Sequence, residues 1–420
     1  MALAAGLLLG IVGHASGNPA FEGFARGAKA IGELWVAALQ LIVLPLVITH
    51  VLAAIVGASA KSVGKLGLRA FLLFLVMLIA AGLFTLLLAP PLIARFPIDP
   101  ETVVSFKAAT PPPQAIGEAG ASGSITDWIG GLLPRNILDA ALHGDIFSLL
   151  LFTVFFAIAV TRLPEDRRRP LMLAFQGLAE ALLQMTHWVL LVTPVGVFAL
   201  VYVLALRSGG STAQMLVVYV VVASTLMVLF TALLYPLTAV AGRTTLRAFA
   251  RSAAPAQLVA LSTRSSIAAL PALVEGGREH LRLPKIATSF VLPFSVSLFK
   301  VNRPMSSLVK LLFLAHVYGI PLRPTSLAIF LITVIILSFG TAGVPQSGPG
   351  LRTLPAYLAA GVPLEGVLVV EAVETIPDIF KTLLNVTGDM SAAALLSRGD
   401  RLSAADVSTS EDPQPSESIA

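Results

Sequence analysis

Long apolar segments recur along this chain and restrict it to one class of structure. Residues 34–58, 70–93, 171–206 and 215–240 each hold enough successive apolar side chains to cross the roughly 30 Å hydrocarbon core of a bilayer as a helix. Only 12% of the 420 residues are charged, about half the share in soluble domains. A backbone that crosses lipid must satisfy its own hydrogen bonds, and a helix does so. The sequence therefore predicts an all-α polytopic membrane protein.

Basic side chains gather in short links that alternate with links poor in them. Because cytoplasmic loops carry an excess of Lys and Arg, we interpret the net charge of +5 as a sign of topology and expect no nucleic-acid partner. We expect a multi-pass protein of the cell (inner or plasma) membrane with both termini in the cytoplasm. The basic links contain Lys61, Lys65, Arg69, Arg162, Arg167, Arg168, Arg169, Arg243, Arg247 and Arg251.

The first residues, MALAAGLLLGIVGHASG, are apolar but lack the basic region with which a signal peptide begins. We therefore expect a short first span. The alternative is a signal peptide cleaved near Ala15, Ser16 and Gly17, which are small enough for a cleavage site.

Two polar interruptions divide apolar segments in the second half of the chain. Residues 262–271 and 340–350 are rich in Ser, Thr, Gly and Pro, and each lies between apolar arms that are short for a full span. Irregular backbone at membrane depth requires burial in protein or a polar cavity, and paired broken segments are typical of transporter binding sites. We expect two re-entrant helical hairpins. Ordinary helices kinked by Pro and Gly are the alternative.

The last apolar segment carries a polar stripe. Glu374, Asp378, Lys381, Asn385 and Asp389 follow one another at steps of four, three, four and four residues, which places them on one helix face. Such a face must point into the helix bundle, where ionisable groups indicate function. The alternative is that Asp378 and Lys381, three residues apart, simply neutralise each other.

Two further cations, Lys300 and Arg303, lie one helical turn apart in the stretch VLPFSVSLFKVNRPMSSLVK, with Asn302 and Pro304 interrupting the regular pattern. A cation at membrane depth needs a partner or water. We expect both cations to point into a ligand chamber. An aqueous vestibule opened by Asn302 and Pro304 is the alternative.

Several motifs resemble the dicarboxylate/amino acid:cation symporters, the family of glutamate transporter homologues. They are LQLIVLPLVITHVLAAIVG, VTPVGVFALVYVLA, TRSSIAALP, FGTAGVPQSG and NVTGD, in the family's order. The resemblance implies eight transmembrane helices plus two re-entrant hairpins in inverted repeats, a homotrimer in contact with membrane lipids, and an elevator-type mechanism. It implies a scaffold domain of residues 1–66 and 97–206 and a transport domain of residues 67–96 and 207–397. Residues 398–420 are polar and rich in Ser and Pro, and we expect them to form a disordered cytoplasmic tail.

The resemblance also implies a site for a small anionic or zwitterionic substrate. Asp378 would bind an α-ammonium group, Ser266 and the backbone near Val344 and Gly348 an α-carboxylate, and Lys381 stands where members with acidic substrates have arginine. The complete expected set is Arg264, Ser265, Ser266, Arg303, Val344, Gly348, Asp378, Lys381, Thr382 and Asn385.

The chain departs from the family at its sodium ligands. Where the family has Asn-Met-Asp-Gly-Thr, residues 299–303 read FKVNR, and Met77 and Leu78 replace a threonine and a serine. Sodium prefers oxygen ligands, which these side chains lack. We therefore expect no metal site and no cofactor. Lys300 would serve as a tethered cation near Asp389 or near the carbonyls around Ser297, Ser338 and Thr341.

The function predicted from these features is secondary active transport of acidic amino acids or dicarboxylates without sodium. Any coupling would use protons, with Glu374, Asp378 or Asp389 as carriers. The alternatives are a non-transporting substrate sensor and an anion-conducting homologue. An enzyme is disfavoured because the chain has no Cys and only scattered His, and because no base is placed to activate Ser265 or Ser266.

Overall fold

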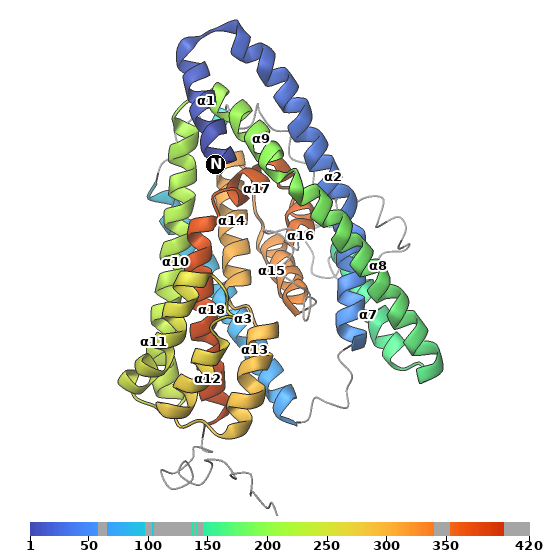
Figure 1. Cartoon of the computed structure of the whole chain (residues 1–420), viewed down its shortest axis with the longest axis vertical. Coiled ribbons are helices and arrows are strands. Elements are labelled where there is room, and N and C mark those ends of the chain that lie inside the picture. The colour runs from blue at the N-terminus through green and yellow to red at the C-terminus, as the bar shows by residue number, and fades with distance from the viewer. Residues whose placement is uncertain are drawn as a thin grey trace, which may run out of the picture.

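The computed structural model describes residues 1–57, 65–96, 146–339 and 353–398, together with positions 103–104, 137 and 140. All regular structure in these ranges is helical, which confirms the all-α prediction (Figure 1). The first helices are α1 (Ala2–Ser16), α2 (Pro19–Gly57), α3 (Lys65–Ala94), α7 (Ile146–Thr161), α8 (Glu165–Leu191), α9 (Thr193–Ser208) and α10 (Ser211–Ala241). They are followed by α11 (Leu246–Thr263), α12 (Leu270–Glu279), the π-helix η2 (Ala287–Val291), α13 (Leu292–Leu298), α14 (Asn302–Tyr318), α15 (Pro324–Phe339), α16 (Leu354–Ala359), α17 (Leu364–Glu371) and α18 (Thr375–Leu396).

Two helices in the described ranges are long and apolar enough to cross a membrane: Gly67–Ala94 with 28 residues and Ser211–Ala241 with 31. The predicted segment 171–206 is instead broken, because α8 and α9 meet at an angle of 53°. Pro194 lies in the first turn of α9, where its missing N–H costs the new helix nothing.

The outer face of α3 shows why these helices need lipid. Leu72, Val76, Ile79, Leu83 and Leu87 are exposed along one stripe, while its opposite face packs into the core. A helix that is apolar on both faces is stable only where both are shielded from water. The chain is therefore a multi-pass membrane protein.

The helices form two neighbouring groups (Figure 1). The first contains α1, which packs along α9, and α2, which contacts α7, α8 and α9. In the second, α18 packs against α10 and α11, and α14 packs against α3. The predicted scaffold and transport domains stay a prediction, as does the disordered tail beyond residue 398, which lies outside the described residues.

Helices α1 and α9 of the first group approach each other closely. A Cβ atom added to Gly10 would lie 2.6 Å from Ala205 Cβ and 2.8 Å from the carbonyl oxygen of Tyr202. Glycine is therefore required at this position, because a side chain would push the two backbones apart.

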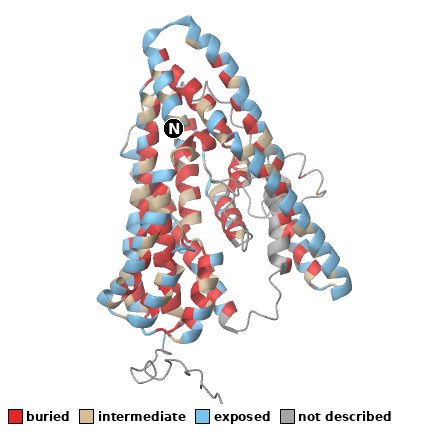
Figure 2. Cartoon of the chain, in the orientation of Figure 1, coloured by how far each residue is buried: buried red, intermediate tan, exposed pale blue. Residues whose placement is uncertain are grey.

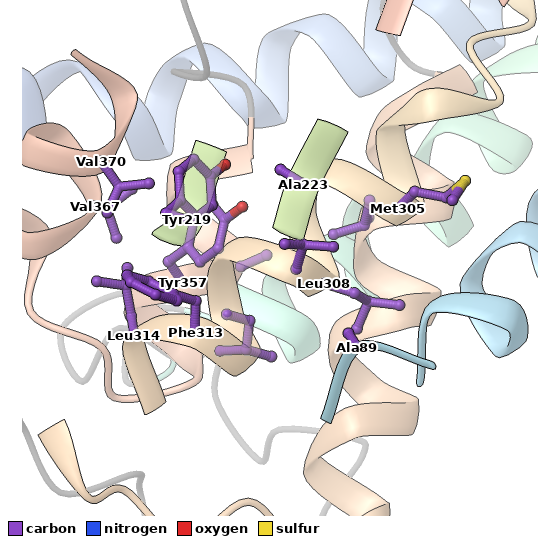
Figure 3. Close-up of a cluster of buried hydrophobic side chains, with 14 of the residues drawn as sticks. Ala89, Tyr219, Ala223, Met305, Leu308, Phe313, Leu314, Tyr357, Val367 and Val370 are labelled. Carbon is purple, nitrogen blue, oxygen red and sulfur yellow. The ribbon is translucent and has the colours of Figure 1, made fainter. Parts of the chain in front are cut away.

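The main apolar core lies mostly in the second group and extends to α2 and α9 of the first (Figure 2). Phe74 of α3 stacks on Phe299 with ring centroids 4.6 Å apart, and Met77 and Leu78 are buried in the same core. The core thus includes positions where the resemblance had suggested sodium ligands. Figure 3 draws another part of it, with Ala89, Tyr219, Ala223, Met305, Leu308, Phe313, Leu314, Tyr357, Val367 and Val370 labelled.

The first polar interruption, residues 262–271, separates two helices that pack against each other, α11 and α12. Arg264 ends α11 in the left-handed conformation, with φ 54°. A Cβ on Gly276 of α12 would lie 2.1 Å from the carbonyl oxygen of Ser252 in α11, so the two arms are in close contact. All of the second interruption, residues 340–350, lies outside the described residues, although the helices on either side of it, α15 and α16, contact each other.

Two polar segments of the second half are broken into separate helices. Phe299 is extended between α13 and α14, with φ −91° and ψ 110°, so Lys300 and Arg303 do not lie one turn apart on a single helix. The last apolar segment, which carries the polar stripe, is likewise broken: α17 ends at Glu371 and α18 begins at Thr375. Pro304 and Pro377 explain both breaks, since each lacks the N–H that a continuing helix would need and is tolerated in a first turn.

Candidate functional site

A cavity of about 980 Å³ lies where the broken segments meet. The α11–α12 tip, the α13–α14 break, the α17–α18 junction and the start of α9 contribute to its wall. Among the predicted site residues, Arg264, Ser265, Ser266, Lys300, Arg303, Glu374, Asp378, Lys381, Thr382 and Asn385 line it. Asp389 is buried away from the cavity, and Val344 and Gly348 lie outside the described residues.

The α11–α12 tip is ordered by its own short polar side chains. The hydroxyl of Thr263 accepts a hydrogen bond from the backbone N–H of Ser265 at 3.2 Å, and the hydroxyl of Ser265 accepts one from the N–H of Ala268 at 3.2 Å. Both hydroxyls therefore stabilise the turn. Ser266 is buried and lines the cavity, so its hydroxyl is the tip group best placed for a ligand.

Arg303 links α14 to the C-terminal end of α15. Its guanidinium Nη1 donates to the carbonyl oxygens of Leu337 and Ser338, both at 3.4 Å. A cation at this end complements the helix dipole. The Ser338 carbonyl, which we had expected near Lys300, thus receives a hydrogen bond from Arg303.

Lys300 and Asp389 lie close enough to interact electrostatically. The ammonium of Lys300 donates to the carbonyl oxygen of Val296 at 2.7 Å. Asp389 is fully buried, and neither of its carboxylate oxygens accepts a hydrogen bond from the described residues. The neighbouring Ser295 hydroxyl donates instead to the Leu292 carbonyl at 3.0 Å. Lys300 therefore lies close enough to Asp389 for its positive charge to act on the buried carboxylate.

Asn385 connects the polar stripe of α18 to the start of α14. Its amide oxygen accepts a hydrogen bond from the backbone N–H of Asn302 at 3.2 Å, and the Asn302 amide donates to the Lys381 carbonyl at 3.3 Å. The amide oxygen of Asn385 is thus engaged by protein. Its NH₂ group remains the part suited to a substrate carboxylate.

Four charged side chains form a buried network beside the cavity. Lys381 pairs with Glu374, and Lys310 pairs with both Glu371 and Glu374, at 3.0 Å from the latter. The hydroxyl of Tyr219 also donates to Glu374. The alternative in which Lys381 neutralises Asp378 is therefore wrong, because Glu374 lies two turns away on the same face and other helices fix it there.

Asp378 is left facing the cavity. It is partly exposed, and its carboxylate forms no ion pair within the described ranges. Its backbone carbonyl accepts a hydrogen bond from the Thr382 hydroxyl at 2.9 Å. A carboxylate in this position is suited to bind an ammonium group.

Lys310, Glu371 and Tyr357 also line the cavity, although they were not among the predicted site residues. Lys310 follows Arg303 by seven residues, which places both on one helix face. That spacing could have predicted that Lys310 faces the cavity, since an ionisable residue at membrane depth indicates function. No pattern in the sequence predicts a place in the cavity wall for Tyr357.

Helices broken around a polar, charge-lined cavity within a membrane bundle define a secondary transporter. The comparison with known proteins agrees. The family model described as the sodium:dicarboxylate symporter family matches residues 1–398, so the chain belongs to this family. Its members are transporters, and the chain is accordingly not an enzyme.

Individual relatives are similar to this chain over most of their length. A proton/sodium-glutamate symport protein of Bacillus subtilis (strain 168) is 29% identical, covering 94% of this chain and 90% of that protein. A proton/glutamate-aspartate symporter of Escherichia coli (strain K12) is 28% identical over 87% and 84%. A C4-dicarboxylate transport protein 2 of Pseudomonas paraeruginosa is 27% identical over 88% and 84%.

Proposed function

We propose that this chain is a secondary transporter of acidic amino acids or C4-dicarboxylates that works without sodium. One observation carries the proposal: the charge of the cavity. Five cationic side chains line it (Arg264, Lys300, Arg303, Lys310 and Lys381) against three carboxylates (Glu371, Glu374 and Asp378), an excess of two positive charges. Such a cavity attracts anions.

Asp389 is buried near Lys300, outside the cavity. When its negative charge is included, the excess of positive charge at the site falls from two to one. An acidic amino acid carries a net charge of −1, so its binding leaves the described part of the site neutral with no added metal ion. A neutral site of this kind avoids the cost of an uncompensated charge at membrane depth. The fixed cations thus take over the charge balance that sodium would otherwise supply.

Substrate recognition would divide between the two ends of the site. Asp378 would bind the ammonium group, because its carboxylate faces the cavity without an ion partner in the described ranges. Ser266, Asn385 and the second hairpin near Val344 and Gly348 would hold the α-carboxylate. Lys381 would bind the side-chain carboxylate, with Arg264 and Arg303 adding positive charge.

The absence of sodium coupling is supported by side-chain chemistry. Phe299, Met77 and Leu78 are buried in the apolar core and offer none of the hard oxygen ligands that sodium prefers. If the transporter is coupled to protons, Asp378 and Asp389 are the better carriers, because Glu374 is already engaged by two lysines and Tyr219.

An elevator movement in a homotrimer is part of the same proposal. It is supported by hydrogen bonds that hold α10, α11 and α18 together. Gln257 donates to Thr387 at 2.7 Å, and Thr238 and Ser391 share a hydrogen bond of 2.6 Å. These helices would then carry the substrate as one rigid body.

Purified protein in liposomes tests the proposal. We expect accumulation of labelled L-glutamate, L-aspartate or succinate under an inward proton gradient, at the same rate with sodium and with choline. A requirement for sodium would contradict the account. Binding without flux would indicate a sensor, and chloride current without substrate movement would indicate an anion pathway.

A further inference from the structure

The four-charge network contains an apparent conflict. Lys381 is the residue expected to bind the side-chain carboxylate of the substrate, yet its ammonium is paired with Glu374. Glu374 is only 4% exposed. If Lys381 turned toward a substrate, it would withdraw a counter-ion from a buried carboxylate, which is strongly unfavourable unless another cation remains.

Lys310 is that other cation. Its ammonium lies 3.0 Å from Oε1 of Glu374, whereas Lys381 contacts the other oxygen, Oε2. The two lysines therefore approach Glu374 from different helices, α14 and α18, and do not compete for one atom. Tyr219 of α10 donates to the same oxygen as Lys310.

The surroundings of the two lysines differ in a way that assigns them different roles. The side chain of Lys310 is 5% exposed and that of Lys381 is 13% exposed. Lys310 is held by Glu371, and its ammonium lies 5.9 Å from the ring centroid of Tyr357. The Tyr357 hydroxyl in turn donates to the carbonyl of Ser307 at 3.1 Å. Lys310 is thus fixed in place, and Lys381 has room to turn.

We propose that Lys310 is a positioning residue that keeps Glu374 paired while Lys381 transfers from Glu374 to a carboxylate of the substrate. Glu371 holds Lys310 ready for this transfer. The inference rests on the proposed function, since it requires Lys381 to bind an anionic ligand. It assigns Lys310 and Glu371, which line the cavity, the role of setting the affinity for the substrate through Glu374 and Lys381.

Two charge-balanced double variants test the transfer. Both K310M/E371Q and K310M/E374Q lose one cation and one carboxylate, so the net charge of the cavity is the same in each. In K310M/E371Q, Lys381 is the only remaining lysine partner of Glu374 and cannot leave it without cost. In K310M/E374Q, no carboxylate remains at position 374, and Lys381 is released.

The measurement is the dissociation constant of whichever of L-aspartate, L-glutamate and succinate stabilises the wild-type protein most. We expect the dissociation constant of K310M/E371Q to be about tenfold or more higher than that of K310M/E374Q. In K310M/E371Q, Lys381 must leave the buried carboxylate of Glu374 without a partner when it binds the ligand. Without ligand, K310M/E374Q should have the lower melting temperature, because its buried Glu371 has lost Lys310, whereas Glu374 in K310M/E371Q still pairs with Lys381. Ligand affinity is therefore the quantity that is compared. A purely structural role for Lys310 would weaken both variants equally.

Equal affinities of the two doubles would overturn the transfer proposal, and so would weaker binding by K310M/E374Q. If one double fails to fold, the E371Q and E374Q single variants are compared. E374Q removes the carboxylate that holds Lys381 and should bind the ligand more tightly than E371Q, in which Lys381 still pairs with Glu374. If none of the three compounds stabilises the wild-type protein, the proposed function itself is wrong and this inference falls with it.

Discussion

The guanidinium of Arg303 donates to the backbone carbonyl of Ser338 at 3.4 Å and so joins the first turn of α14 to the last turn of α15. Arg303 also lines the cavity. One cation therefore contacts the arm of the second hairpin and contributes to the charge that a substrate meets.

Replacing Arg303 with Gln should weaken binding of an acidic substrate by about tenfold or more, because the variant removes a cation from a partly desolvated site. Binding is measured by calorimetry with L-glutamate or L-aspartate. The control is Arg251→Gln, which removes the same charge from an exposed position on α11. An equal effect of both variants would show that only the overall charge of the protein matters.

Asp378→Asn should separate amino acids from dicarboxylates. An amide cannot neutralise an ammonium group, so the affinity for L-aspartate should fall by about tenfold or more. Succinate has no ammonium group, and its affinity should stay the same or rise. Competition binding with both compounds distinguishes these results. A parallel loss of both would mean that Asp378 supports the fold and does not select the substrate.

Lys300→Met removes the cation that lies near the buried carboxylate of Asp389. The variant should be less stable than the wild-type protein, since a buried charge without compensation is costly. Sodium should then raise its melting temperature, whereas it should leave that of the wild-type protein unchanged. Lys285→Met, at an exposed position, is the matched control. Unchanged stability of K300M would show that Lys300 is merely solvated.

Replacing glycine with alanine should have opposite effects on stability at a packed position, Gly10, and at an open position, Gly27. Gly10→Ala introduces a Cβ 2.6 Å from that of Ala205 and should lower stability by about 1–3 kcal/mol. Gly27→Ala in α2 meets nothing within 4 Å and should raise stability by about 0.5–1 kcal/mol. Thermal unfolding in detergent measures both. A loss at Gly27 as large as that at Gly10 would contradict the assigned packing.

Local sequence patterns predicted the helical class and the polar stripe of the last helix, and the resemblance to the family supplied the other predicted residues that line the cavity. The spacing of Glu374, Asp378, Lys381, Asn385 and Asp389 correctly placed them on an inward face of one helix. That information is local, because the period of the helix determines which side chains share a face.

The backbone breaks and the ion partners depend on residues far away in the sequence. Lys381 pairs with Glu374 and not with Asp378, because Lys310 and Tyr219 from two other helices help to hold Glu374. The extended conformation at Phe299 likewise accompanies a hydrogen bond between Asn302 and Asn385. Neither tertiary contact has a signature in the spacing of nearby residues.

The claim on which the account depends is that fixed cations replace sodium in balancing the charge of the site. The most direct measurement is the thermal stabilisation of the purified protein by L-glutamate and L-aspartate, in buffers that contain either sodium or choline as the only added cation. We expect the same ligand-induced shift in both buffers. A shift that appears only with sodium would contradict the claim.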